Sequence, residues 1–249
     1  MRLPIVPAAS ASLRKELYCI PRLPHLPLQI SRPLAAGKPN DSYRSEWAVY
    51  QWIEGEAVRR DGISDYCDAA EALADFVLAL HCADASDAPP YGRHNNFRGC
   101  PLVERDELTR KAIVSLSDLY NAAALTQVWE ASTAIPSWQN ELVWIHGDIH
   151  SGNLLMRNGQ IKAVIDFGLM AAGDPAVDLI VSWSLFEGEA RRRFRDVLNV
   201  DEATWLRGRG WALTTALVAL AYYRDTNRFL ADMSKQVLSE VLADFGTPE

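Results

Sequence analysis

Residues 144–178 read WIHGDIHSGNLLMRNGQIKAVIDFGLMAAGDPAVD and decide the fold of this 249-residue chain. Within them, Asn158-Gly159 lies between two segments in which apolar and polar residues alternate. Asn-Gly is the strongest short signal for a two-residue hairpin turn, because both turn residues need positive φ. The facing pairs would then be Arg157 and Gln160, Leu155 and Lys162, Asn153 and Val164, and Ser151 and Asp166. The sequence therefore predicts a β-hairpin whose open end brings Asn153 and Asp166 together.

Asp148 lies just upstream of that open end, in a loop that follows the apolar run 142–145. A single small volume would then hold two carboxylates and one carboxamide. Oxygen ligands of this kind suit Mg²⁺, which takes a few side chains and completes its coordination with water and substrate phosphates. A carboxylate that does not bind the metal can accept a proton from an attacking hydroxyl. Phosphoryl transfer to an alcohol needs this combination.

HGDIHSGN, IDFG and GDPAVD, in this order, resemble the aminoglycoside phosphotransferase family, whose fold is similar to that of protein kinases and choline kinases. The resemblance implies that Asp148 is the catalytic base and that Asn153 and Asp166 bind Mg²⁺. His150 lies where the protein-kinase catalytic loop has a lysine, which implies contact with the γ-phosphate or the substrate. We expect His146 to be a hydrogen-bonded structural histidine, because buried polar groups find partners.

The segment Gly173-Asp174-Pro175 reads as a helix start, with Asp174 as N-cap and Pro175 in the first helical position. Asp174 is therefore expected to be structural. Two interpretations of Asp178 stay open. It is either an exposed carboxylate in the first helical turn, or, as the resemblance implies, a buried brace for the backbone of the catalytic loop.

Residues 48–56, AVYQWIEGE, are similar to the last strand of the family's small lobe and the hinge that follows it. Aligning Gly55 with the family's hinge glycine assigns the adenine contacts to the carbonyl of Gln51 and the N–H of Ile53. This part of the sequence implies a nucleotide site, with ATP or GTP as co-substrate.

The start of the chain departs from the family. Arg2-Leu3-Pro4 resembles the end of the strand that carries a phosphate-binding lysine, with Arg2 in the lysine position, and Glu16 resembles the helix glutamate that holds it. Arginine presents its hydrogen-bond donors differently from lysine. The alternative to a phosphate-binding role is that Arg2 is a frayed terminal residue that does nothing. No phosphate-loop strands precede Arg2, so we expect a truncated small lobe, poor order over residues 1–7, weak ATP binding and slow turnover.

Composition excludes several other classes of protein. The chain has 32 acidic and 25 basic residues and a net charge of −7, which disfavours nucleic acid as a partner. Four scattered cysteines form no C-x-x-C pair, so we expect reduced thiols in a cytoplasmic protein without a signal peptide. The apolar run 211–223 is shorter than the ~20 residues of a membrane span and predicts a buried helix.

Apolar spacing predicts the remaining elements. We expect a strand over 48–53 and helices over 12–18, 64–82, 175–186, 188–198, 204–223 and 231–245. The loop 84–101 contains aromatic and basic residues between Tyr91 and Gly99 that could contact a substrate, and a solvated loop is the equal alternative.

Together these observations predict an α+β, protein-kinase-like two-lobe fold. A truncated small N-terminal lobe with the hinge would occupy residues 1–54, and a large, mostly helical C-terminal lobe would occupy residues 55–249. The predicted function is transfer of the γ-phosphate of ATP or GTP to a hydroxyl of a small molecule, with antibiotic resistance as the consequence if the acceptor is an antibiotic. The alternative is an impaired or non-catalytic family remnant that binds nucleotide weakly. A protein kinase is disfavoured because no Ala-Pro-Glu follows the DFG segment. The resemblance leaves the acceptor open among aminoglycosides, macrolides, sugars, choline-like amines and homoserine-like metabolites.

Overall fold

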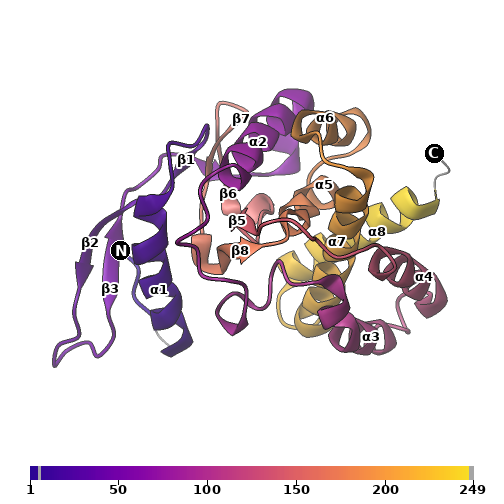
Figure 1. Cartoon of the computed structure of the whole chain (residues 1–249), viewed down its shortest axis with the longest axis horizontal. Helices are drawn as coiled ribbons and strands as arrows, with labels where there is room; N and C mark the ends of the chain where they lie inside the picture. Colours follow the sequence, from indigo (N-terminus) through magenta and orange to yellow (C-terminus); the bar gives the residue numbers. More distant parts are fainter. Residues whose placement is uncertain (5–6, 247–249) are drawn as a thin grey trace.

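The computed structural model describes residues 1–4 and 7–246 and has the predicted α+β, two-lobe architecture. A small layer of strands with one helix lies at one end, short sheets lie in the middle, and helices fill the other end (Figure 1). Residues 144–178, which we call the catalytic segment after their predicted role, run through the middle, where the two parts meet.

The small end contains helix α1 (Pro7–Cys19) and strands β2 (Pro33–Gly37) and β3 (Trp47–Tyr50), which pair antiparallel. The helix is longer than predicted and the strand is shorter. Arg2 extends this pairing, since its N–H donates to the Ala48 carbonyl at 2.8 Å and its carbonyl accepts from the Ala48 N–H at 3.2 Å. Poor order remains our expectation for residues 1–7, of which residues 5–6 lie outside the described residues.

The central sheet has the order β1-β7-β6-β4, formed by Gln29–Ile30, Gln160–Val164, Leu154–Arg157 and Glu56–Ala57. Strands β6 and β7 form the predicted hairpin, and Asn158 and Gly159 have φ of 54° and 73°. Positive φ at both turn residues confirms the turn prediction.

The predicted register of the hairpin is right only next to the turn. Arg157 faces Gln160, but the register shifts between Leu155 and Met156, so Leu155 pairs with Ala163 and not with Lys162. The reason is a β-bulge, an extra residue that the alternation of the sequence does not reveal. The Ile165 N–H therefore donates to the Asn153 carbonyl, at 2.9 Å, where Val164 was expected. Asn153 and Asp166 still meet at the open end of the hairpin.

A third, two-stranded sheet pairs β5 (Val143–Ile145) with β8 (Ala171–Gly173). The catalytic loop leaves β5, passes through a 3₁₀ turn over Ser151–Asn153 and enters β6. Both ends of the loop are therefore fixed by strands.

Helices form the rest of the molecule. They are α2 (Tyr66–His81), α3 (Asp106–Ser115), α4 (Ala122–Thr133), α5 (Val181–Ser184), α6 (Gly188–Leu198), α7 (Glu202–Tyr223) and α8 (Arg228–Gly246). The prediction over 188–198 matches α6, and those for α2, α7 and α8 differ by a few residues. The helix predicted over 175–186 is a 3₁₀ helix, Pro175–Ile180, followed by the short α5.

The core of the helical part is continuous with the catalytic segment. Trp129, Trp144, Trp183 and Trp211 are at most 1% exposed. The middle of α7 is buried as predicted, whereas Tyr222 near its end is 73% exposed. In the described part of the chain, no helix has both the length and the apolarity that crossing a membrane requires.

Candidate active site

The backbone of the catalytic loop is held by Asp178. Its carboxylate accepts from the backbone N–H of His146 at 2.9 Å and of Gly147 at 2.7 Å, and it lies 3.1 Å from His81 Nε2. Asp178 is fully buried, so these contacts replace its hydration. The interpretation of Asp178 as a brace is therefore correct, and the exposed-carboxylate interpretation is wrong.

Gly147 is required by the close approach of two segments. Its φ is +80°, and a Cβ at this position would lie 2.9 Å from the carbonyl oxygen of Leu169. Only glycine adopts this conformation without strain. The tight packing brings the loop before Asp148 against the segment that follows Asp166.

His146 is structural, as expected. It is fully buried, its Nδ1 accepts from the Asp148 N–H at 3.2 Å, and its Nε2 lies 3.1 Å from the Ile165 carbonyl. Its ring contacts Phe167 edge-on at 4.7 Å between centroids. His146 therefore links the two segments that carry Asp148 and Asp166.

Asp148 lies among three polar side chains. Its Oδ2 accepts from Asn153 Nδ2 at 3.1 Å and is 3.6 Å from His150 Nε2, and its Oδ1 is 3.6 Å from an Arg98 nitrogen. Burial raises the pKa of Asp148, but His150 and Arg98 outweigh this effect and lower the pKa to about 2. The carboxylate is therefore ionised at neutral pH and free to accept a proton or a hydrogen bond.

The backbones of Asn153 and Asp166 lie close to each other, because the Ile165 N–H donates to the Asn153 carbonyl. The Asn153 amide also donates to the Asp148 carbonyl at 2.9 Å, which directs its nitrogen to the loop and leaves its oxygen for another partner. Asp166 has φ +61°, uncommon for a residue with a side chain, and its Oδ1 accepts from the Gly168 N–H at 3.3 Å.

Asn153 and Asp166 could offer a metal ion one amide oxygen and one carboxylate. Within residues 1–4 and 7–246, no group of three or more His, Cys, Asp or Glu side chains could hold a metal ion. One carboxylate and one amide oxygen are typical of a Mg²⁺ that takes its other ligands from water and substrate phosphates.

Arg2 and Glu16 come together as the sequence suggested. Arg2 forms an ion pair with the buried Glu16, and its second amino group donates to Asp166 Oδ1 at 2.9 Å. The Tyr50 hydroxyl donates to Glu16 at 3.1 Å. Burial raises the pKa of Glu16, and the charge of Arg2 opposes this effect. The interpretation of Arg2 as a frayed residue without contacts is therefore wrong.

A cavity of about 380 Å³ collects the predicted nucleotide residues. Its lining includes Arg2, Glu16, Gln51, Ile53 and Asp166. The Gln51 carbonyl, predicted to face adenine, accepts from the Ser31 hydroxyl at 2.7 Å. A carbonyl oxygen has two lone pairs, so this contact leaves room for a second donor.

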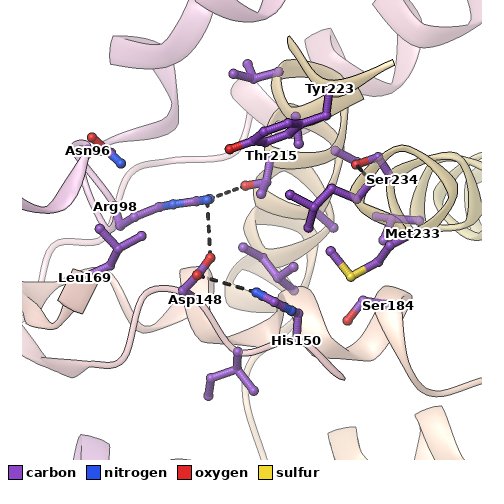
Figure 2. A pocket seen from close by; sticks show the side chains of 18 of the residues that line it. Asn96, Arg98, Asp148, His150, Leu169, Ser184, Thr215, Tyr223, Met233 and Ser234 are labelled. Carbon is purple, nitrogen blue, oxygen red and sulfur yellow. Dashed lines mark hydrogen bonds and ion pairs between the residues drawn. The ribbon is translucent and has the colours of Figure 1, made fainter. Parts of the chain in front are cut away.

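A second cavity, of about 430 Å³, opens on the other side of the catalytic loop and is lined by Asp148 and His150. Figure 2 shows Arg98 pointing into this cavity, with its guanidinium between Asp148 and Thr215. Arg98 belongs to the loop 84–101, which is anchored because the Asp174 N–H donates to the Gly99 carbonyl at 2.9 Å. Arg98 of this loop therefore lines a cavity, and contact of the loop with a substrate stays a prediction.

Several cavity residues were not singled out from the sequence. They include Arg105, from a 3₁₀ turn before α3, and Thr215, from α7. Only the chain's packing brings these residues together, and no short motif marks them. Asp174, in contrast, is structural as predicted, because it caps the Ala176 N–H at 3.0 Å and forms a buried ion pair with Arg207 at 2.7 Å.

Comparison with known proteins identifies the family and the fold. The sequence matches a family model described as "Phosphotransferase enzyme family" over residues 2–212, and no curated protein matches it. Among solved structures, the GDP and kanamycin complex of APH(2")-IIIa has a TM-score of 0.73 at 18% identity, covering 97% of this chain and 86% of that chain.

Two further structures show the same fold. The streptomycin-ATP-APH(2")-IIa ternary complex has a TM-score of 0.60 at 19% identity, covering 97% of this chain and 83% of that chain. Macrolide 2'-phosphotransferase type I has a TM-score of 0.64 at 17% identity, covering 100% of this chain and 83% of that chain. The kinase-like α+β fold is thus the fold of known phosphotransferases, and this chain belongs to the phosphotransferase enzyme family.

Proposed function

We propose that this protein transfers the γ-phosphoryl group of ATP or GTP to a hydroxyl group of a small molecule. The nucleotide would occupy the cavity beside Gln51 and Ile53, and the acceptor would occupy the cavity beside Asp148. Relatives with this fold have been solved with GDP or with ATP, which supports a purine nucleotide as co-substrate.

The observation that carries this proposal is the position of the catalytic segment between two cavities. Asp166 and Phe167 line the nucleotide cavity, whereas Leu169, two residues further on, lines the acceptor cavity together with Asp148. A phosphoryl donor and an alcohol would therefore approach each other at the open end of the hairpin. Positioning and electrostatics supply most of the catalysis in phosphoryl transfer, and this arrangement provides both.

Asp148 would orient the acceptor hydroxyl and take its proton. With a pKa of about 2 it is a weak base, which suits a loose transition state in which the proton leaves late. His150, 3.6 Å from Asp148, would contact the incoming hydroxyl or the transferred phosphoryl group.

Asn153 and Asp166 would hold Mg²⁺, which would neutralise charge on the nucleotide phosphates when bound. Arg2, held by Glu16, would lie beside the same phosphates. A guanidinium is suited to phosphate because its donors form a planar fork. ATP dependence, the Mg²⁺ site and cytoplasmic localisation remain parts of this proposal.

The test is transfer of labelled γ-phosphate from ATP and from GTP to a panel of acceptors, with Asp148→Asn as the matched variant. We expect Asp148→Asn to lower kcat by about 100-fold or more, because loss of a general base costs that much. Its affinity for nucleotide should stay close to that of the wild type. Asp196→Asn, an exposed substitution on α6, is the control and should leave kcat unchanged.

Two outcomes would contradict the proposal. Transfer by Asp148→Asn at more than about a tenth of the wild-type rate would remove Asp148 from the role of base. Nucleotide binding without transfer to any acceptor class would favour the non-catalytic family member that the sequence left open.

A further inference from the structure

The acceptor cavity has an unusual balance of charge for a site that would take an amine. Among the residues that line it, Asp148 is the only acid, and Arg98 and Arg105 are two bases. The other polar side chains of the lining carry hydroxyl, amide or imidazole groups. A polyamine acceptor needs carboxylates around its ammonium groups, and this cavity offers one.

Arg98 is already engaged in the structure. Its guanidinium lies 3.6 Å from Asp148 and donates to the Thr215 hydroxyl (Figure 2). Burial lowers the pKa of Arg98, and the charges of Asp148 and Asp178 oppose this effect. Arg98 therefore has two carboxylates near it, and Arg105 is the other cation of the lining.

Arg105 has no acidic partner in the described part of the chain. Its Nη1 donates to the Asn96 carbonyl at 3.1 Å, and its Nε is buried without a hydrogen-bond partner. Burial lowers the pKa of Arg105, and the charge of Arg98 lowers it further. The Trp211 ring, with its centroid 5.9 Å from the guanidinium carbon, offers only weak compensation. Arg105 is thus a partly buried cation without a counter-ion, so an anion bound beside it would be stabilised.

Most of the other side chains that line the cavity are apolar. Its lining includes Ile149, Leu169, Ile180, Leu230 and Val237. At its mouth, Tyr222 is 73% exposed and packs at right angles on Tyr223, with 4.7 Å between ring centroids. In Figure 2 the Tyr223 hydroxyl points to the side of the cavity where Arg98 and Asn96 lie. Burial of an apolar ligand body against this surface would favour binding, whereas burial of a highly hydrated ligand would not.

We propose that the acceptor is a hydroxylated molecule with an apolar body and an anionic group, carboxylate or phosphate, which binds at Arg105. This inference rests on the proposed function, because it names the acceptor of the same site. The hydroxyl would face Asp148, the anion would lie at Arg105, and the apolar body would extend towards Tyr222. Polycationic acceptors would bind poorly, since their ammonium groups would meet the two guanidinium groups.

The experiment measures binding by calorimetry without nucleotide, so that its result does not depend on turnover. The probes share one skeleton and differ in charge: 3-hydroxyoctanoate, 3-hydroxyoctyl phosphate, 3-hydroxyoctanamide and 3-hydroxyoctylamine, with kanamycin as a polycation. We expect at least one of the two anions to bind about tenfold or more tightly than the amide, the amine and kanamycin, the difference that a charge-assisted hydrogen bond gives. Comparison of the two anions tells a carboxylate site from a phosphate site.

Variants then assign the preference to Arg105. Arg105→Gln should abolish the advantage of the anions over the amide, whereas Arg105→Lys should keep most of it. Arg192→Gln, an exposed substitution on α6 that removes the same charge, is the matched control and should change nothing. If Arg105→Gln fails to fold, binding of the anionic probes and of the amide to the wild-type protein is measured at increasing NaCl concentration instead. The advantage of the anions over the amide should then fall, because salt screens the attraction between the anion and Arg105.

The inference is wrong if the amine or kanamycin binds as tightly as the anions, if none of the anionic probes binds, or if Arg105→Gln keeps the preference. Failure of the proposed function looks different. In that case an anion would bind at Arg105, and no phosphoryl group would be transferred to it or to any other acceptor.

Discussion

Three aspartates of the catalytic segment differ in the groups that neutralise them. Asp148 lies beside Arg98 at 3.6 Å, and Asp178 is buried against backbone N–H groups. Asp166 is paired with Arg2 at 2.9 Å, and its side chain is 50% exposed. An exposed carboxylate can exchange one cation for another at low cost, whereas a buried one cannot. Of the three, Asp166 is therefore the one suited to bind a metal that arrives with the nucleotide.

The first prediction at this scale concerns that metal. Asp166→Asn and Asn153→Ala should each raise the Mg²⁺ concentration needed for ATP to stabilise the protein. The effect should be larger for Asp166→Asn, because it removes a charge as well as a ligand. Thermal unfolding at fixed ATP analogue and varied Mg²⁺ measures the shift, with the exposed Asp196→Asn as control. An unchanged Mg²⁺ midpoint in both variants would show that the metal binds elsewhere.

The sequence predicts the residues of the site that short-range patterns bring together. Asn158-Gly159 fixes the turn, so the meeting of Asn153 and Asp166 follows, although the bulge between Leu155 and Met156 shifts the register by one residue. Arg98 and Arg105 could not be assigned in the same way. Their place in the cavity depends on how a loop and a 3₁₀ turn pack on α7, and no periodicity encodes those contacts.

At the scale of elements, the 3₁₀ helix Pro175–Ile180 does more than connect two segments. It begins with the Asp174 cap and carries Asp178, whose carboxylate holds the loop that positions Asp148. All six of its residues are buried. The helix thus joins the packed helical core to the catalytic loop.

The prediction at the scale of elements is that Asp178→Asn weakens folding and activity together. The new amide would place a donor against a backbone N–H donor. Leaving buried hydrogen-bonding groups unsatisfied costs about 1–3 kcal/mol, which corresponds to a fall in Tm of roughly 2–12 °C for a chain of this size. Scanning calorimetry and kcat on the same sample measure both effects.

Asp75→Asn, an exposed substitution on α2, is the control for the loss of one negative charge. A normal Tm with strongly reduced kcat would mean that Asp178 acts in the chemistry and not through the loop. A normal kcat with reduced Tm would mean that the loop keeps its shape without the brace.

Elements with one buried face could be predicted from the sequence, and fully buried or weakly patterned ones could not. Helix α6 has the predicted bounds, because Ala190, Phe194 and Leu198 repeat every four residues on its buried face. The segment 175–186 is buried on all sides, so its pattern does not tell a 3₁₀ helix from an α-helix. Helix α3 escaped prediction, since Leu108 and Val114 are exposed and obscure its buried face.

At the scale of the whole molecule, Arg2 joins parts that are far apart in the sequence. Its backbone pairs with Ala48 of β3, and its side chain contacts Glu16 of α1 and Asp166 of the hairpin. These contacts join the small end to the middle of the molecule, which lies next to it in Figure 1. The nucleotide cavity lies at this junction, so bound nucleotide would contact both parts at once.

The last prediction is that Arg2→Gln weakens ATP binding by roughly tenfold, the lower end of the range for a hydrogen bond to a charged group. The lower end applies because the Arg2 side chain is 41% exposed and solvent screens its charge. Calorimetric titration with ATP and Mg²⁺ measures the change. Arg14→Gln is the control, since Arg14 is 66% exposed, lies on the same helix as Glu16 and pairs with Glu46 instead. Equal ATP affinity in the two variants would mean that Arg2 serves only to join α1 to the hairpin. A loss confined to Arg2→Gln, with Tm unchanged in the absence of nucleotide, would place its guanidinium at the phosphates.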